Sequence, residues 1–166
     1  MGELGEVGPL DLTVDGADEV APNLDLLKGR GGAMVRERIV AAAAKSQIII
    51  VGEHKLVRAL GERGGVPLEV IPMAESLVMR EVERIGLAPR LRLDGSGLRP
   101  FISDNGNLVV DCAVAAPLAD GRVARELERA LLDIVGVVDT GLFLGTADRV
   151  IVGRSDGSVN DLFRKT

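Results

Sequence analysis

The sequence predicts an α/β fold built in two parts, a parallel-sheet domain and a smaller α+β domain inserted into it. Segment 10–52 reads as strand, helix, strand, which is the order of a parallel α/β unit. Segment 66–143 reads as β-α-β-β-α-β, an order that is complete in itself. Of the 166 residues, 46% are apolar and 27% are charged, which is enough core for one ordinary domain or two small ones.

Three elements define the first part. Leu10–Asp15 alternates apolar and polar residues, as a half-buried strand does, and runs into a loop. Ala33–Lys45 is rich in alanine, the strongest helix former. Gln47–Gly52 contains a run of apolar residues that is typical of a strand buried on both faces of a parallel sheet. We therefore expect a partial Rossmann-like sheet.

Turn signals and helical spacing divide the second part into short elements. Gly86 ends one apolar helical pattern, and Asp104-Asn105-Gly106-Asn107 is a hairpin signal. The order of the elements is that of a ferredoxin-like α+β domain. The four strands of this order are expected at Leu68–Ile71, Pro89–Leu93, Leu108–Cys112 and Val137–Leu144, and its two helices at Ala74–Ile85 and Val123–Ile134; Phe101–Ser103 is expected as an additional short strand.

The end of the chain is expected to rejoin the first part. Val150–Gly153 is apolar and predicts a final strand, and Ser158–Phe163 predicts a short terminal helix. The predicted domains are therefore residues 1–65 together with 144–166, and residues 66–143.

Composition excludes several classes of function. The formal net charge of -5 argues against nonspecific nucleic-acid binding, which needs clustered positive charge. The single Cys112 permits no internal disulfide or cysteine-based zinc cluster, and the single His54 permits no histidine-rich metal site. No apolar run approaches the ~20 residues that cross a bilayer, and the first residues lack the pattern of a signal peptide. We expect a cytoplasmic protein that contacts no membrane and no nucleic acid and that has neither of these kinds of metal site.

A glycine-rich loop, Lys28-Gly29-Arg30-Gly31-Gly32, precedes the predicted helix of the first part. Its glycines permit close backbone approach, and a helix N-terminus offers unpaired N–H groups to an anion. Lys28 adds a positive charge. A tight turn into the helix explains the glycines equally well, and the loop matches neither the dinucleotide fingerprint nor a Walker A sequence.

Three carboxylates flank this loop in the sequence. Asp15 and Asp18 follow a strand that should end at the carboxyl edge of the sheet, where open α/β sheets bind ligands. Asp-Gly is also ordinary turn chemistry. Glu37 lies in the first turns of the predicted helix, where the helix dipole favours an acid without any catalytic role. Together with Lys28 these groups favour an enzyme that acts on a small phosphorylated metabolite.

Two polar residues follow the predicted strand Gln47–Gly52. Lys55 is the better candidate for a contact to a hydroxyl or a phosphate, whereas His54 is expected to be a polar loop residue. Cys112 is expected to be a small buried apolar side chain.

In their joint spacing these segments resemble the type A ribose-5-phosphate isomerases, the cofactor-free isomerases of the pentose phosphate pathway. The resemblance runs in order over nearly the whole chain. The matching motifs are Val14-Asp15-Gly16-Ala17-Asp18-Glu19, Lys28-Gly29-Arg30-Gly31-Gly32-Ala33, Arg36-Glu37-Arg38, Val66–Pro72, Ser103–Asn107 and Gly136–Phe143.

The resemblance implies an aldose–ketose isomerase that interconverts ribose 5-phosphate and ribulose 5-phosphate through an enediolate. It implies that Glu37 is the general base and that Asp15 assists ring opening. It places Asp18 and Lys28 around the oxygens on which negative charge develops. It also implies substrate contacts from a further set of residues, namely Gly16, Ala17, Gly29, Arg30, Gly31 and Lys55.

Members of that family begin with several dozen further residues, including a Gly/Thr/Ser-rich loop that grips the substrate phosphate, and this sequence does not contain them. We therefore expect exposed apolar sheet surface, with either a homo-oligomer (a dimer or tetramer) or a separate chain that supplies the segment. Two alternatives to the enzyme are a sugar-phosphate-binding sensor without catalysis and a degenerate subunit that acts in assembly.

Overall fold

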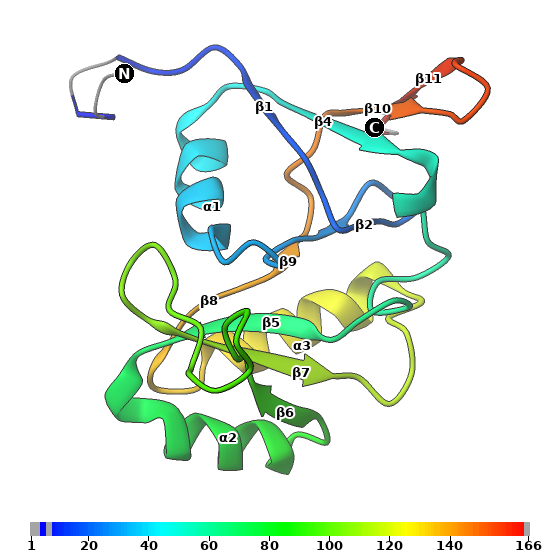
Figure 1. Ribbon diagram of the computed structural model, residues 1–166. Coiled ribbons are helices and arrows are strands. Elements are labelled where there is room, and N and C mark those ends of the chain that lie inside the picture. The colour runs from blue at the N-terminus through cyan, green and yellow to red at the C-terminus, as the bar shows by residue number, and fades with distance from the viewer. Residues whose placement is uncertain (1–3, 6–7, 165–166) are drawn as a thin grey trace.

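The computed structural model describes residues 4–5 and 8–164, and these residues form two stacked parts (Figure 1). The parallel-sheet part carries helix α1 (Met34–Ala43), and the antiparallel-sheet part carries helices α2 (Glu75–Arg84) and α3 (Gly121–Leu132). These helices begin and end within three residues of the predicted ones. No helix in the described ranges is long and apolar enough to cross a membrane.

The parallel-sheet part contains a four-stranded sheet in the order β1-β4-β10-β11. Strands β1 (Thr13–Asp15), β4 (Gln47–Gly52) and β10 (Arg149–Gly153) are parallel, and β11 (Val159–Phe163) is antiparallel to β10. Because β1 and β4 are parallel, both strands end at the same edge of the sheet.

The terminal helix predicted for Ser158–Phe163 is wrong, because this segment forms β11. Gly157, with a φ of 84°, closes a turn in which its N–H donates to the Arg154 carbonyl oxygen at 3.1 Å. The Asp156 carboxylate accepts the Ser158 N–H at 2.8 Å. This turn returns the chain along β10, so a hairpin takes the place of the predicted helix.

A small antiparallel sheet joins the two parts in the order β2-β3-β9. Its strands β2 (Glu19–Val20), β3 (Leu26–Leu27) and β9 (Leu142–Phe143) contain two residues each. Two residues show no periodicity, so sequence patterning did not predict β2 or β3 and merged β9 with the strand before it.

The antiparallel-sheet part has the strand order β6-β7-β5-β8 and follows the predicted chain order β-α-β-β-α-β. The strands are β5 (Val66–Val70), β6 (Ala88–Leu91), β7 (Leu108–Ala113) and β8 (Val137–Thr140), with each neighbouring pair antiparallel. The strand predicted at Phe101–Ser103 does not form, and only Ile102 makes an isolated bridge, to Leu108. Two short 3₁₀ turns, η1 (Glu53–Lys55) and η2 (Pro72–Ala74), complete the fold.

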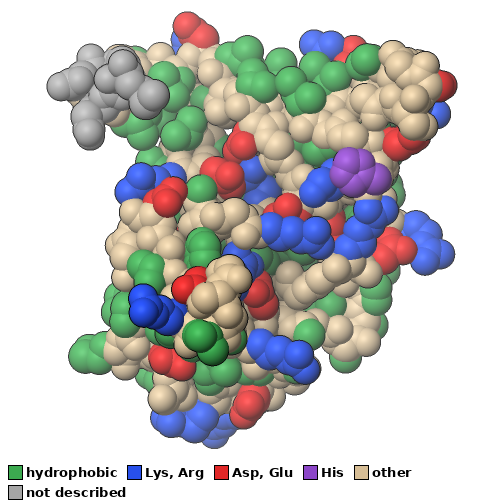
Figure 2. Space-filling model, in the orientation of Figure 1, with side chains coloured by type: hydrophobic (Ala, Val, Ile, Leu, Met, Phe, Trp, Pro, Cys, Tyr) green, Lys and Arg blue, Asp and Glu red, His purple; other side chains and the backbone are tan. Residues whose placement is uncertain are grey.

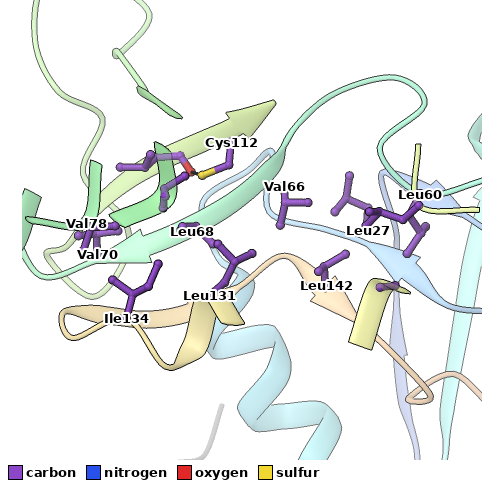
Figure 3. Close-up of a cluster of buried hydrophobic side chains, with 14 of the residues drawn as sticks. Leu27, Leu60, Val66, Leu68, Val70, Val78, Cys112, Leu131, Ile134 and Leu142 are labelled. Atoms are coloured by element: carbon purple, nitrogen blue, oxygen red, sulfur yellow. Dashed lines mark hydrogen bonds between the residues drawn. The ribbon is translucent and has the colours of Figure 1, made fainter. Parts of the chain in front are cut away.

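Two apolar cores hold these layers. The larger one fills the space between the antiparallel sheet and its two helices and includes Leu68, Val78, Cys112 and Leu131 (Figure 3). The smaller one packs under the parallel sheet around Phe143. Burying one large aliphatic side chain stabilises the fold by roughly 1.5–3 kcal/mol. The sequence has no tryptophan or tyrosine, so the stability of both cores comes mainly from aliphatic side chains.

The second face of the parallel sheet is open to solvent in this structure. Val14 of β1 is 55% exposed and Ile50 of β4 is 52% exposed, whereas Ile49 and Val51 are buried beneath the sheet. The prediction that β4 is buried on both faces is therefore wrong for the described residues, and the expectation of exposed apolar sheet surface is confirmed.

Candidate active site

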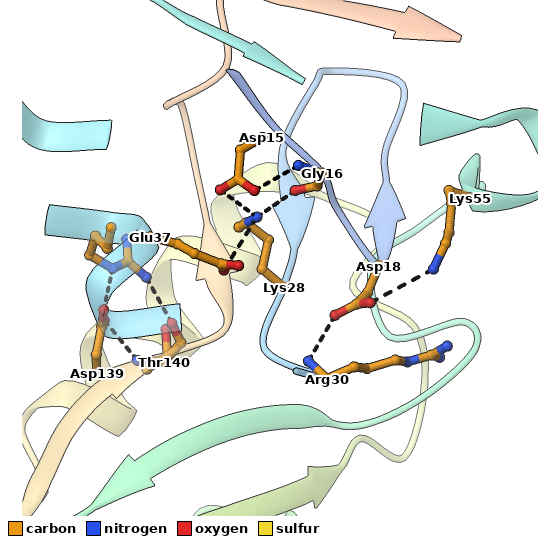
Figure 4. A network of polar contacts seen from close by, with 10 residues as sticks. Asp15, Gly16, Asp18, Lys28, Arg30, Glu37, Lys55, Asp139 and Thr140 are labelled. Carbon is orange, nitrogen blue, oxygen red and sulfur yellow. Dashed lines mark hydrogen bonds and ion pairs between the residues drawn. The ribbon is translucent and has the colours of Figure 1, made fainter. Parts of the chain in front are cut away.

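The candidate site lies at the carboxyl edge of the parallel sheet, where four segments meet (Figure 4). They are the loop that follows β1, the glycine loop that follows β3, the first turn of α1 and the η1 turn that follows β4. The edge to which both strands run is the one that open α/β sheets use for ligands. Figure 2 shows acidic and basic side chains gathered across the middle of this face, between the two parts of the molecule.

Lys28 is the centre of the charge cluster. Its side chain is 3% exposed, and its Nζ lies 2.9 Å from Oδ2 of Asp15 and 3.3 Å from Oε2 of Glu37. The same ammonium donates a hydrogen bond to the Gly16 carbonyl oxygen. The Phe143 ring lies beneath it, with its centroid 5.5 Å from Nζ. A buried lysine with these partners is held in one position.

Glu37 points into the site from the first turn of α1, with 30% of its side chain exposed. Burial raises the pKa of its carboxyl above the usual value, Lys28 lowers the pKa, and the nearby Asp15 raises it. The Glu37 carboxyl is therefore not a freely solvated surface group. The carboxylate is also paired with Lys28. The mechanism that the family resemblance implies requires the two groups to lie close together but does not require an ion pair.

Asp15 and Asp18 occupy opposite sides of the loop after β1. Oδ1 of Asp15 accepts the Gly16 N–H at 2.7 Å, so this residue makes the turn that its sequence suggested as well as the ion pair to Lys28. Oδ2 of Asp18 accepts the Arg30 N–H at 3.0 Å, and Oδ1 lies 3.7 Å from Nζ of Lys55. Asp18 therefore connects the glycine loop to η1.

Backbone geometry explains two glycines of the loop. Gly29 has a φ of 109°, and a Cβ there would lie 2.8 Å from Sδ of Met34 and 2.9 Å from Cγ of Pro67. Gly32 has a φ of 80°, and a Cβ there would overlap the Phe101 ring. Both positions need glycine for the turn itself, so the structural interpretation of the loop holds alongside its place in the site.

A cavity of about 210 Å³ opens among these groups. Its volume is that of a small polar ligand rather than a dinucleotide. Arg30 and Lys55 do not line the cavity, but both contact Asp18, which does. His54 is exposed on η1, as expected of a polar loop residue. The lining residues are Asp15, Gly16, Ala17, Asp18, Lys28, Gly29, Gly31 and Glu37.

The chemistry available here is proton transfer beside a fixed positive charge. A half-buried carboxylate with a raised pKa is a stronger base than an ordinary glutamate, and the ammonium can stabilise an oxyanion. Among residues 4–5 and 8–164, no group of three His, Cys, Asp or Glu side chains is placed to hold a metal ion.

Comparison with known proteins assigns the chain to a family. Residues 1–157 match the family model described as ribose 5-phosphate isomerase A (phosphoriboisomerase A). The chain belongs to this family. Ribose-5-phosphate isomerase A of Deinococcus radiodurans is 46% identical over 157 residues, which are 94% of this chain and 66% of the relative. The enzyme of Thermomicrobium roseum is 48% identical over 152 residues, covering 91% of this chain and 62% of the relative.

Solved ribose 5-phosphate isomerases share the fold. A structure of D-ribose-5-phosphate isomerase in complex with phospho-erythronic acid matches with a TM-score of 0.90 at 39% identity, covering 98% of this chain and 69% of that chain. The enzyme of Plasmodium falciparum matches with a TM-score of 0.88 at 33% identity, covering 100% of this chain and 69% of that chain. The chain spans a little under two thirds of the length of the curated isomerases cited above.

The structure of this isomerase-family chain adds Arg38 to the site's surroundings, which sequence patterning missed. Its Nε donates to Asp139 at 2.5 Å, and its Nη2 donates to the carbonyl oxygens of Thr140 and Leu142, both at 2.8 Å. Its guanidinium carbon lies 4.2 Å from the centroid of the Phe143 ring. These contacts fasten α1 to β8 and β9 one residue beyond Glu37. The sequence shows only an arginine beside a glutamate, which is typical of an exposed helix.

Proposed function

We propose that this site interconverts ribose 5-phosphate and ribulose 5-phosphate through an enediolate. The observation that carries the proposal is the placement of the Glu37 carboxylate, the Lys28 ammonium and Asp15 around one small polar cavity. Moving a proton between adjacent carbons needs a base that reaches both carbons and a cation that offsets the oxyanion. Family membership supports the same reaction, and one similar structure is a complex with phospho-erythronic acid.

In the proposed mechanism Glu37 is the base. It removes a proton from carbon 2 of the open-chain aldose and returns it to carbon 1. Its raised pKa suits this task, because a base with a pKa nearer to neutral holds the transferred proton more readily. A base of this kind contributes about 10²–10⁴-fold in rate.

Lys28 faces the oxygens of the enediolate and stabilises the charge that develops on them. Because Lys28 is already fixed by Asp15 and the Gly16 carbonyl, it does not have to reorganise during the reaction. Asp15 moves the proton that opening of the furanose ring requires.

Asp18 lies across the cavity from Glu37 and orders the loop that contacts the sugar. We assign substrate contacts to Gly16, Ala17, Asp18, Gly29 and Gly31. We also assign substrate contacts to the side chains of Arg30 and Lys55. For Arg30 the side chain is chosen because its backbone N–H already donates to Asp18.

The architecture inferred for this function has two domains. We propose that residues 1–65 with 144–166 form the Rossmann-like catalytic domain and that residues 66–143 form the ferredoxin-like insert. The exposed Val14 and Ile50 support the expectation of a homo-oligomer or of a separate chain that covers the sheet. Size-exclusion chromatography tests this part, and a stable monomer at high concentration contradicts it.

Conversion of ribose 5-phosphate in D₂O tests the reaction. Proton transfer through the solvent-exchangeable Glu37 carboxyl predicts ribulose 5-phosphate with deuterium at carbon 1, detected by NMR. Binding without turnover would instead favour the sensor, and neither binding nor turnover would favour the assembly subunit.

A further inference from the structure

An ion pair of the antiparallel-sheet part, Arg92 with Asp111, contacts the backbone of the glycine loop. Arg92 follows β6, and its side chain is 15% exposed. Its Nε donates to Oδ2 of Asp111 on β7 at 2.8 Å, and its Nη2 donates to the other oxygen of the same carboxylate. This bidentate geometry fixes the plane of the guanidinium.

The remaining nitrogen of Arg92 reaches the loop. Nη1 donates to the Gly29 carbonyl oxygen at 2.7 Å and to the Arg30 carbonyl oxygen at 3.0 Å. One guanidinium therefore holds the carbonyl groups of the two residues that follow Lys28. The backbone of Arg92 is itself fixed, because its N–H donates to Val109 at 2.8 Å and its carbonyl oxygen accepts the Phe101 N–H at 2.8 Å.

The restraint continues from the loop to a carboxylate of the site. Arg30 accepts from Arg92 through its carbonyl oxygen and donates to Oδ2 of Asp18 through its N–H. Phe101, whose ring centroid lies 5.8 Å from the Arg92 guanidinium carbon, packs against Gly32 at the far end of the loop. The loop is thus held between Asp18 on one side and Arg92 on the other.

We propose that Arg92, fixed by Asp111, is a positioning residue that sets the glycine loop and, through the Arg30 amide, the orientation of the Asp18 carboxylate. Arg92 is not among the residues that line the cavity of Asp15, Asp18, Lys28 and Glu37. This inference rests on the proposed isomerase function for its effect on turnover, while its structural content, an ordered Arg30 amide, does not depend on that function.

The chain offers a matched control. Arg149 pairs with Asp161 across β10 and β11 at 2.6 Å and lies over the Phe163 ring at 5.5 Å, which repeats the arginine, aspartate and phenylalanine arrangement away from the loop. Arg92→Met and Arg149→Met each remove an ion pair between strands, and only the first releases the loop.

The test measures hydrogen exchange of the Arg30 amide by NMR together with kcat and KM for ribose 5-phosphate. Arg92→Met is expected to speed Arg30 exchange at least about tenfold and to lower kcat by about 10-fold to 10²-fold, since small displacements of catalytic groups have effects of this size. Arg149→Met should leave both quantities within about twofold of the wild type. Arg92→Lys keeps the positive charge but not the planar set of donors, so its Arg30 exchange rate and its kcat should lie between those of Arg92→Met and the wild type.

Equal Arg30 exchange in Arg92→Met, Arg149→Met and the wild type overturns the proposal, whatever the activity. If Arg92→Met does not fold, the same comparison between Arg92→Lys and the wild type decides it. A wild-type protein that converts no ribose 5-phosphate refutes the proposed function. The exchange measurement still tests whether Arg92 orders the Arg30 amide.

Discussion

The ammonium nitrogen of Lys28 lies 3.3 Å from a carboxylate oxygen of Glu37. This contact joins the glycine loop that follows β3 to helix α1, close to the end of β1. Lys28 is nearly inaccessible to solvent and also pairs with Asp15, so the positive charge of the site is fixed before any ligand arrives.

Removing the ammonium tests its electrostatic role. Lys28→Met should lower kcat by about 10²–10³-fold, the effect of losing one preorganised oxyanion donor. Because Lys28 lowers the pKa of Glu37, that pKa should rise in the variant, and the acid limb of the kcat/KM profile should move to higher pH. Lys45→Met removes an exposed pair with Asp11 and is the control. An unshifted acid limb in Lys28→Met would show that Glu37 is not the group that titrates.

The raised pKa of Glu37 also has a consequence for stability. Because burial raises its pKa in the folded chain, the contribution of Glu37 to stability is full below about pH 4.5 and is lost as pH rises through the folded pKa. Glu37→Gln stays neutral and avoids this loss. Its Tm relative to the wild type should therefore be higher at pH 7.5 than at pH 4. The opposite trend in thermal unfolding would contradict the pKa assignment.

Arg38 is expected to be the strongest stability determinant next to the site. Arg38→Met leaves the buried Asp139 carboxylate without its partner, and breaking a buried pair in this way costs about 3–5 kcal/mol. Burial raises the pKa of Asp139 and Arg38 lowers it, so the variant should lose more stability at pH 7.5 than at pH 4, where Asp139 is more protonated. Urea unfolding at pH 7.5 and at pH 4 measures the loss of stability and its dependence on pH. Arg84→Met, which breaks an exposed pair with Glu81, should change stability by less than about 1 kcal/mol.

Two adjacent glycines of the loop should differ sharply. Gly32→Ala places a methyl group on the Phe101 ring at a positive φ and should destabilise the protein by more than about 1 kcal/mol. At Gly31 a Cβ meets no atom within 4 Å, so Gly31→Ala should be neutral within about 0.5 kcal/mol. Similar midpoints in urea unfolding for the two variants would contradict the loop geometry.

Long periodic segments of this chain could be predicted from sequence, and short ones could not. The segments that became α1, α2, α3 and β4 carry enough residues to show a helical or strand pattern. Strands β2 and β3 carry two residues each and exist because β3 pairs with both β2 and β9. The error at β11 arose because the tertiary pairing with β10 outweighed local preference.

The candidate site was predictable as a set of residues but not as a network. The joint spacing of Asp15, Asp18, Lys28 and Glu37 suggested that they meet, and the structure brings Asp15, Lys28 and Glu37 into direct contact. Arg38 and Arg92 escaped prediction because their partners lie 101 and 19 residues away along the chain. Arginines at surface-like positions give no sequence signal of such contacts.

The proton shuttle is tested most directly by the turnover of Glu37→Gln. Glutamine keeps the size and one acceptor oxygen of glutamate but cannot take a proton from carbon. The account predicts a fall in kcat for ribose 5-phosphate of at least about 10²-fold, with sugar-phosphate binding retained, while Glu126→Gln at an exposed position of α3 keeps wild-type turnover. Wild-type kcat in Glu37→Gln would contradict the assignment of Glu37 as the base.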